Sequence, residues 1–254
     1  MSNDFDFRLD GFEPADADSA YAEQGIWPSA LTILAEHHEP PNGSPSYVVA
    51  HDSSATWAVP DDPQILAIKV TRDHAEKTFT FKSAYHATLP FAQNWLTEHG
   101  CPPEQIAQID KGFMKPADDL TTHVEHQIRT SGKRYEVLAT RTSDYDPCEA
   151  WTLTRDSNAA QSPIRLFLDE GHPDGRTYTM REGAFADEDA ARHWLDDRSR
   201  PLPQPPENRG EAADLRTRAA LTRSAGTSTI TTAPDARSAP SAGTAQRPAT
   251  GRSV

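Results

Sequence analysis

Two pairs of histidines are the side chains of this sequence that most resemble metal ligands. His37 and His38 are adjacent in EHHE, and His123 and His126 lie three residues apart in HVEH. Two imidazoles at that spacing on a helix can share one ion, but a zinc site takes at least three protein ligands. The spacing specifies no third ligand, and neither pair matches the H-E-x-x-H pattern. We therefore expect solvated histidines, and no metal or other cofactor.

Nucleophilic chemistry has one candidate thiol and one candidate acid–base pair. Cys148 lies beside Glu149, and no base is tied to it by sequence, so we expect an inert thiol. His51 adjoins Asp52, but the second half of the chain has no His-Asp counterpart, and we expect a loop histidine there. The sequence lacks the Gly-rich phosphate-binding patterns and the G-x-S-x-G pattern of hydrolases. Surface carboxylates are too numerous to single out a catalytic pair: Asp144, Asp146, Asp169, Glu170, Asp196 and Asp197.

The sequence pattern of the elements that would position these side chains occurs twice in the chain. FTFKSAYHATLPFAQNWL at 79–96 is matched 99 residues later by YTMREGAFADEDAARHWL at 178–195, with Trp95 opposite Trp194. With short gaps, Trp57 meets Trp151 and Tyr47 meets Tyr135. Such self-similarity is typical of a repeated supersecondary unit. We predict an internal duplication with units at 45–100 and 133–198.

Each unit contains four short segments with the composition of strands, followed by one segment with helical spacing. The first unit reads SPSYVVAH, ATWAV, ILAIKVT, KTFTFK and then LPFAQNWLTEHG, and the second reads KRYEVLAT, EAWTLT, IRLFLD, RTYTMR and then DEDAARHWLDDR. The fold class is therefore α+β, with two tandem β-β-β-β-α units whose antiparallel sheets each pack on a helix. Strand alternation places Leu66, Ile68 and Val70 with Phe79 and Phe81 under the helix that carries Trp95.

The remaining segments flank these units. The N-terminal segment 1–44 and the connecting segment 101–132 each contain a predicted amphipathic helix, at 27–38 and at 116–128. From 199 to 254 there is no Phe, Tyr or Trp, and Pro, Ala, Thr and Arg dominate. Such a composition cannot offset the ordering entropy of roughly 1 to 2 kcal/mol per residue, so we expect a disordered tail. Within it, 211–223 has the composition of a short helix.

Charge is distributed unevenly along the 254 residues. Residues 1–200 carry 34 acidic and 18 basic side chains, a net of −16, whereas 201–254 carry 4 acidic and 7 basic, a net of +3. A body this negative repels phosphate backbones and favours basic partners. The longest apolar stretch, 26–35, is about half of the roughly 20 residues that cross a bilayer. With two cysteines and no signal-peptide pattern, we expect a reducing cytoplasm and no membrane association.

The outward face of the predicted third and fourth strands is the one basic surface in this acidic body. Its side chains are Lys69, Lys82, Arg165, Phe167 and Arg181. The element order of 45–198 resembles that of the Pur and Whirly families, and this resemblance implies binding of single-stranded nucleic acid on the sheet faces. Basic, threonine and aromatic side chains on a strand face suit backbone contacts and base stacking. The alternative is that these faces pack the units together.

We therefore expect a non-enzymatic, acidic binding or adaptor protein that acts through protein–protein contacts, with a basic protein as the preferred partner. The first alternative is a single-stranded nucleic-acid-binding protein that uses the five strand-face residues, although the net charge disfavours it. The second alternative is an enzyme of unrecognised type.

Overall fold

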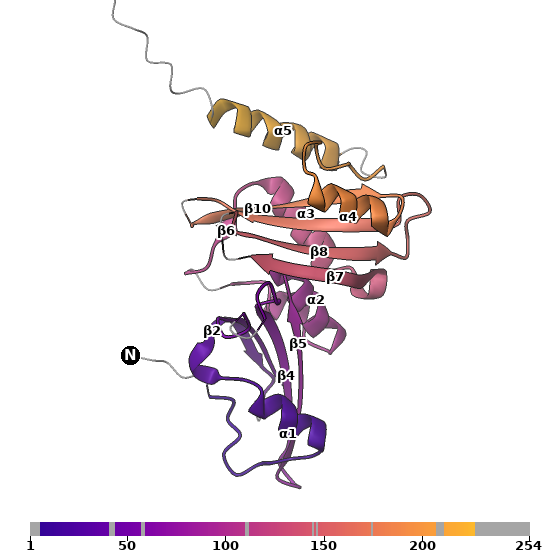
Figure 1. The fold of residues 1–254 in the computed structure, drawn as a ribbon. Coiled ribbons are helices and arrows are strands. Elements are labelled where there is room, and N and C mark those ends of the chain that lie inside the picture. Colours follow the sequence, from indigo (N-terminus) through magenta and orange to yellow (C-terminus); the bar gives the residue numbers. More distant parts are fainter. Residues whose placement is uncertain are drawn as a thin grey trace, which may run out of the picture.

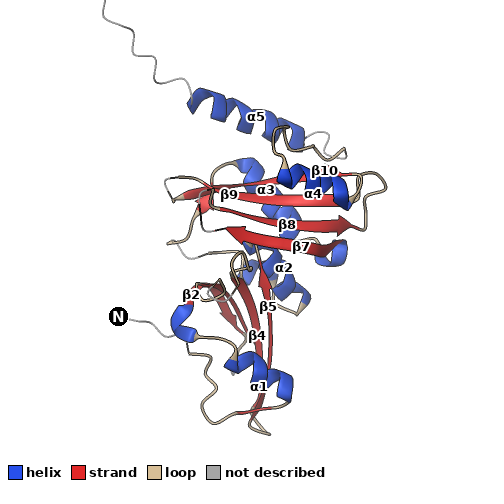
Figure 2. Ribbon diagram, in the orientation of Figure 1, coloured by secondary structure: helices blue, strands red, loops and turns tan. Residues whose placement is uncertain are grey.

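The computed structural model describes residues 6–40, 44–56, 59–109, 112–143, 145, 147–173, 175–206 and 211–226, with only the backbone of 211–213 and 222–226. Two five-stranded mixed sheets with helices on their faces define an α+β protein (Figures 1 and 2). The elements of the first half are β1 (Glu13–Pro14), α1 (Ala17–Gln24), β2 (Leu31–His38), β3 (Ser46–Asp52), β4 (Ile65–Asp73), β5 (Thr78–His86) and α2 (Leu89–Glu98). The elements of the second half are β6 (Lys115–Pro116), α3 (Asp119–Arg129), β7 (Tyr135–Ser143), β8 (Glu149–Asp156), β9 (Ile164–Gly171), β10 (Thr177–Phe185), α4 (Glu188–Asp196) and α5 (Glu211–Gly226).

The two sheets have the same strand order. The first runs β1-β5-β4-β3-β2 and the second β6-β10-β9-β8-β7. Four strands of each sheet form an antiparallel meander, as expected, but the two-residue strands β1 and β6 add parallel pairings to β5 and β10. The sheets are therefore mixed, and each half begins with a strand and a helix that precede the meander.

The same polar contacts fix this first helix in both halves. Asp16 caps α1 by accepting from the backbone N–H of residue 19, and Asp118 caps α3 by accepting from that of residue 121. The Ser19 hydroxyl then accepts from the backbone N–H of Phe81, and the Thr121 hydroxyl accepts from that of Met180. Each hydroxyl therefore ties its helix to the edge strand of the meander.

The predicted helix at 27–38 is wrong, because this segment forms a 3-10 turn (Pro28–Ala30) followed by strand β2. The pairing of β2 with β3 shifts register between Ile33 and Ala35, which is the signature of a β-bulge. Leu31 packs on the face of the sheet under α1, whereas the bulge lets both Leu34 and Ala35 pack on the face under α2. The spacing of these three buried residues, three and four positions, imitates the period of a helix. The helix predicted at 116–128 overlaps α3, which runs from Asp119 to Arg129.

The predicted strand ATWAV at 55–59 also differs from the structure. Residues 55, 56 and 59 lie in turns and bends, and 57 and 58 lie outside the described residues. The first meander therefore begins with β2 and not with β3. Since β7, which starts at Tyr135, is then the counterpart of β2, Tyr47 on β3 and Tyr135 do not occupy equivalent places.

Both faces of the first sheet are covered. Leu66, Ile68, Val70, Phe79 and Phe81 pack under α1 and residues 7–12. The prediction that they lie under the helix carrying Trp95 is wrong, because α2 covers the opposite face, which contains Val49, Ile65 and Ala67. In the second sheet, Leu153, Ile164 and Leu166 pack with α4, whereas Phe167 and Met180 pack with α3.

Helix α2 lies between the two sheets and contacts both halves (Figure 1). Ala92 and Leu96 pack on the first sheet, while Phe91 packs edge-on against the rings of Tyr135 and Phe167. The two halves therefore share a core. No helix in the part of the chain that the structure describes is long and apolar enough to cross a membrane.

The C-terminal segment differs in part from the expected disordered tail. Leu202 packs in the core under α4, and the backbone N–H of Ala184 donates to the carbonyl of Pro203 at 2.9 Å. The predicted helix at 211–223 lies within α5, whose Leu215 and Ala219 pack with α3. Residues 227–254 lie outside the described residues.

Candidate functional site

The five predicted strand-face contacts are not gathered on one surface. Lys82 is exposed on β5. Lys69 is partly buried, because its Nζ donates to the carbonyl of His99 at 2.7 Å and lies 5.6 Å from the ring centre of Tyr47. Arg181 forms an ion pair with Asp118, the N-cap of α3. Of these three side chains, only Lys82 lies fully at the surface.

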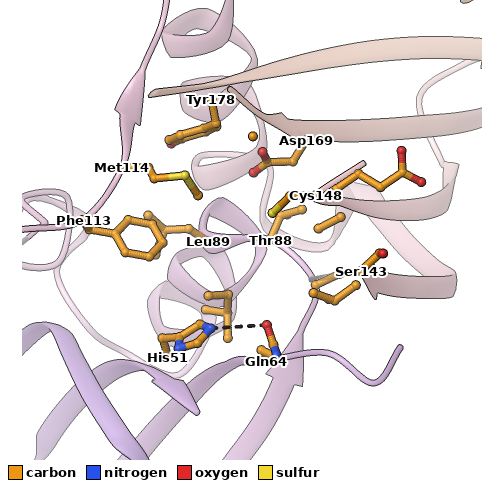
Figure 3. A pocket seen from close by; sticks show the side chains of 16 residues that line it. His51, Gln64, Thr88, Leu89, Phe113, Met114, Ser143, Cys148, Asp169 and Tyr178 are labelled. Carbon is orange, nitrogen blue, oxygen red and sulfur yellow. Dashed lines mark hydrogen bonds between the residues drawn. The ribbon is translucent and has the colours of Figure 1, made fainter. Parts of the chain in front are cut away.

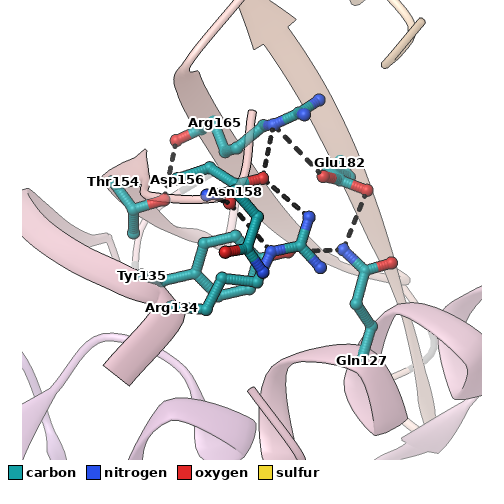
Figure 4. Close-up of polar contacts among 8 residues, drawn as sticks. All are labelled: Gln127, Arg134, Tyr135, Thr154, Asp156, Asn158, Arg165 and Glu182. Atoms are coloured by element: carbon teal, nitrogen blue, oxygen red, sulfur yellow. Dashed lines mark hydrogen bonds and ion pairs between the residues drawn. The ribbon is translucent and has the colours of Figure 1, made fainter. Parts of the chain in front are cut away.

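Arg165 and Phe167 are part of the interior of the second half. Arg165 is 1% exposed, and its Nε lies 3.3 Å from Asp156 and 3.8 Å from Glu182 (Figure 4). Arg134 completes this network with two hydrogen bonds to Asp156 at 2.8 and 2.7 Å. Arg165 is held in the interior by this network, and Phe167 is held there by its contacts with other aromatic rings. Neither can contact a nucleic acid at the surface.

The first pair of histidines weighed as ligands has other contacts. The ring of His37 stacks on Tyr47, and His38 shares a 2.7 Å hydrogen bond with Ser46. His51 bonds to Gln64 at 3.2 Å, whereas Asp52 accepts from the hydroxyl of Tyr85, so the candidate acid–base pair is not formed. The expected loop position of His51 is wrong, because His51 lies on β3. Within the described residues, no group of three or more His, Cys, Asp or Glu side chains could hold a metal ion.

A cavity of about 130 Å³ lies where the two halves meet, and we call it the inter-sheet cavity (Figure 3). Elements from both halves line it. Its lining residues include His51, Gln64, Ile65, Ala87, Thr88 and Leu89 from the first half, and Phe113, Met114, Thr142, Cys148, Glu149, Asp169 and Tyr178 from the second. The walls are largely apolar, with few polar groups between them, as is typical of ligand pockets.

One carboxyl group points into this cavity. Asp169, on β9, lies near the ring of Tyr178 and the thiol of Cys148 in Figure 3. Burial raises the pKa of Asp169 well above its ordinary value, and the nearby carboxyl groups of Glu125 and Glu170 raise it further. Burial also raises the pKa of Glu125, which accepts a hydrogen bond from the hydroxyl of Tyr178.

Two hydroxyl groups in the cavity wall lack hydrogen-bond partners within the described part of the chain. They belong to Thr88, which is 1% exposed, and to Thr142, which is 8% exposed. Buried hydroxyls are nearly always hydrogen-bonded in folded proteins, and an exception calls for an explanation. These two hydroxyls and Asp169 therefore provide unused hydrogen-bonding capacity in one cavity.

A second, shallower hollow of about 440 Å³ lies on the surface of the first half. We call it the Trp27–Tyr85 groove, and it is lined by Gly25, Trp27, Ser54, Ala55, Asp62, Pro63 and Tyr85. Trp27 is 60% exposed and Tyr85 is 41% exposed. Two large aromatic side chains thus lie open to solvent beside a carboxylate.

Sequence reasoning missed both hollows, although part of the signal was present. Alternation along β9 places Asp169 on the same face as Arg165 and Phe167, which are buried, and so separates it from its exposed neighbour Glu170. Trp27 was hidden inside the wrongly predicted helix. Comparison of the chain with protein-family models, with curated proteins and with solved structures gives no significant match.

Proposed function

We propose that this protein is a non-enzymatic binding or adaptor protein that captures a basic protein partner in the Trp27–Tyr85 groove. The exposure of Trp27 is the single observation that carries the proposal. Tryptophan, tyrosine and arginine dominate the binding energy of protein interfaces, and an indole left 60% exposed in a groove is poised to be covered by a partner.

Charge supports a basic partner. Asp62 lines the groove, and Asp52 lies directly behind it as the acceptor for the Tyr85 hydroxyl. The net charge of −16 over residues 1–200 extends this negative field over the body. A lysine or arginine of the partner would gain both this attraction and a cation–π contact with the indole.

Two further features accompany this proposal. The equivalent contacts of Ser19 with Phe81 and of Thr121 with Met180 support the view that the halves arose by internal duplication. Cys101 and Cys148 form no disulfide bond with each other, and we propose a reducing cytoplasm as the compartment.

A quantitative capture experiment tests the function. The full chain is immobilised, and proteins retained from a lysate of the source organism are compared among the wild type, Trp27→Ala, Asp62→Asn and the matched control Tyr145→Ala. Tyr145 is 80% exposed in the second half and does not line the groove. We expect a basic protein that the wild type and Tyr145→Ala retain equally, with at least tenfold loss in Trp27→Ala and a smaller loss in Asp62→Asn. If every retained protein binds Trp27→Ala as well as it binds the wild type, the proposal is wrong.

A further inference from the structure

We propose that the inter-sheet cavity is a binding site for a small organic cation, a primary ammonium group attached to one apolar group of about the size of a benzene ring. The carboxyl group of Asp169 would hold the ammonium, and the apolar walls would hold the rest of the ligand. This site lies apart from the Trp27–Tyr85 groove, so the inference does not depend on the proposed function.

The size and lining of the cavity define the apolar part of the ligand. Ile65, Ala87, Leu89, Phe113 and Met114 provide its apolar surface. The volume of about 130 Å³ is close to the roughly 150 Å³ of engineered apolar cavities that bind benzene. A single ring or a short branched chain therefore fits, whereas a nucleotide or a folded peptide segment does not.

The charges around the cavity select a cation. Asp169 has no hydrogen bond or ion pair within the described residues, and its carboxyl group points towards the open space of the cavity (Figure 3). Glu149 also lines the cavity, but Arg198 donates two hydrogen bonds to it, at 2.5 and 2.8 Å, so the selection of a cation depends on Asp169. An anionic ligand would be repelled by the carboxylate of Asp169. A cation would give Asp169 the opposite charge that a desolvated carboxylate needs.

The two unpartnered hydroxyl groups account for the primary ammonium. A primary ammonium has three N–H donors, and one carboxylate does not use all of them. The hydroxyl oxygens of Thr88 and Thr142 can each accept one hydrogen bond. Thr88 comes from the first half, while Thr142 and Asp169 come from the second. A bound ammonium would therefore also link the two halves.

Three aromatic probes of similar shape and different charge test the proposal on the full chain. They are benzylamine, benzyl alcohol and benzoate, and isobutylamine is added as a smaller amine. Isothermal titration at neutral pH should show that an amine binds at least tenfold more tightly than benzyl alcohol, with no binding of benzoate. Bound amine should also raise the melting temperature, because a ligand that binds only the folded state stabilises it.

The variants test whether the carboxyl group of Asp169 binds the amine, and not the overall negative charge of the protein. Asp169→Asn should weaken amine binding at least tenfold, whereas the matched control Glu170→Gln, an exposed side chain on the opposite face of the same strand, should change it less than twofold. Thr88→Val keeps the shape of the side chain and should weaken amine binding about threefold without affecting benzyl alcohol. The proposal is overturned if neither amine binds at 10 mM, if benzyl alcohol binds as tightly as benzylamine, or if both Asp169→Asn and Thr88→Val keep the wild-type amine affinity.

Discussion

Helices α2 and α4 occupy the same place in the two halves, yet their surroundings differ. Each follows the last strand of its meander and packs one face on its own sheet. The outer face of α2 is buried against the second half, whereas Ala191 is the one fully buried side chain of α4. Helix α2 thus joins the two halves, whereas the outer face of α4 is largely exposed.

The difference lies in three positions of the outer face. At the 99-residue offset, Phe91 corresponds to Ala190, Gln93 to Arg192 and Asn94 to His193. Phe91 enters the second core, Gln93 accepts from Arg129 at 3.2 Å, and the Asn94 amide makes two hydrogen bonds of 3.0 Å to the backbone of Gly132. The residues Ala190, Arg192 and His193 are exposed. The junction between the halves therefore depends on few side chains.

The largest expected effect follows from removing the aromatic ring at this junction. Phe91→Ala should destabilise the protein by about 3 to 5 kcal/mol, because it leaves a cavity beside Tyr135 and Phe167. Ala190→Phe, the reverse change on α4, should change stability by less than about 0.5 kcal/mol. Urea unfolding followed by fluorescence measures both. A loss below about 1 kcal/mol in Phe91→Ala would show that α2 does not couple the halves.

A second difference between the halves is the buried ionic network. Leu66 and Ser83 of the first half occupy the places of Arg165 and Glu182. Arg165→Leu should cost about 3 kcal/mol, because Glu182 loses a buried opposite charge. The double variant Arg165→Leu/Glu182→Ser imports both first-half residues and should regain at least half of that loss. Thermal unfolding decides the point, and a double variant less stable than the single one contradicts it.

The class of fold and most of the strands were predictable, because the alternation of side chains along a strand is a local signal. The internal duplication stays a prediction. The α1 helix was not predicted, since its apolar residues show no clear amphipathic stripe; its position depends on the Asp16 cap and the Ser19 contact with Phe81. The bulge in β2 imitated a helical period for the reason given above. In each case, a contact distant in sequence decided the local structure.

The surface role predicted for Arg165 and Phe167 fails for a related reason. Alternation correctly placed them together on one face of β9, but it does not say which element covers that face. In the structure that element is α3, which lies 36 to 48 residues earlier in the chain. Whether Lys82 contacts a partner stays a prediction.

Removing the hydrogen bonds at the junction between the halves should have a smaller effect on stability. Asn94→Ala removes both bonds to Gly132 and leaves a backbone N–H and carbonyl without these partners, so it should cost about 2 kcal/mol. His193→Ala, at the equivalent place on α4, should cost less than about 0.5 kcal/mol. Hydrogen exchange of the Gly132 amide provides a local readout. Unchanged exchange in Asn94→Ala would mean that this contact does not hold the junction.

The smallest expected effect on stability concerns Asp169, which in the second half occupies the position that Val70 has in the first. Because the pKa of Asp169 is raised in the folded state, this group costs stability as the pH rises from about 4, the ordinary pKa of an aspartate, towards the folded value. The ionisable groups of the surrounding elements include His51, Glu125, Arg129, Cys148, Glu149 with its partner Arg198, Glu170 and Tyr178.

Asp169→Asn should therefore be more stable than the wild type by about 1 kcal/mol at pH 7, on the scale of one desolvated polar group. The gain should vanish below about pH 3, under the ordinary aspartate pKa of about 4, where the wild-type carboxyl group is protonated in both the folded and the unfolded state. Glu170→Gln should show a difference below about 0.5 kcal/mol at both pH values. Urea unfolding at the two pH values measures all three proteins. An Asp169→Asn variant that is less stable than the wild type at pH 7 would show that the carboxylate is held by a favourable contact, and the two halves would then differ at this position by a stabilising acid.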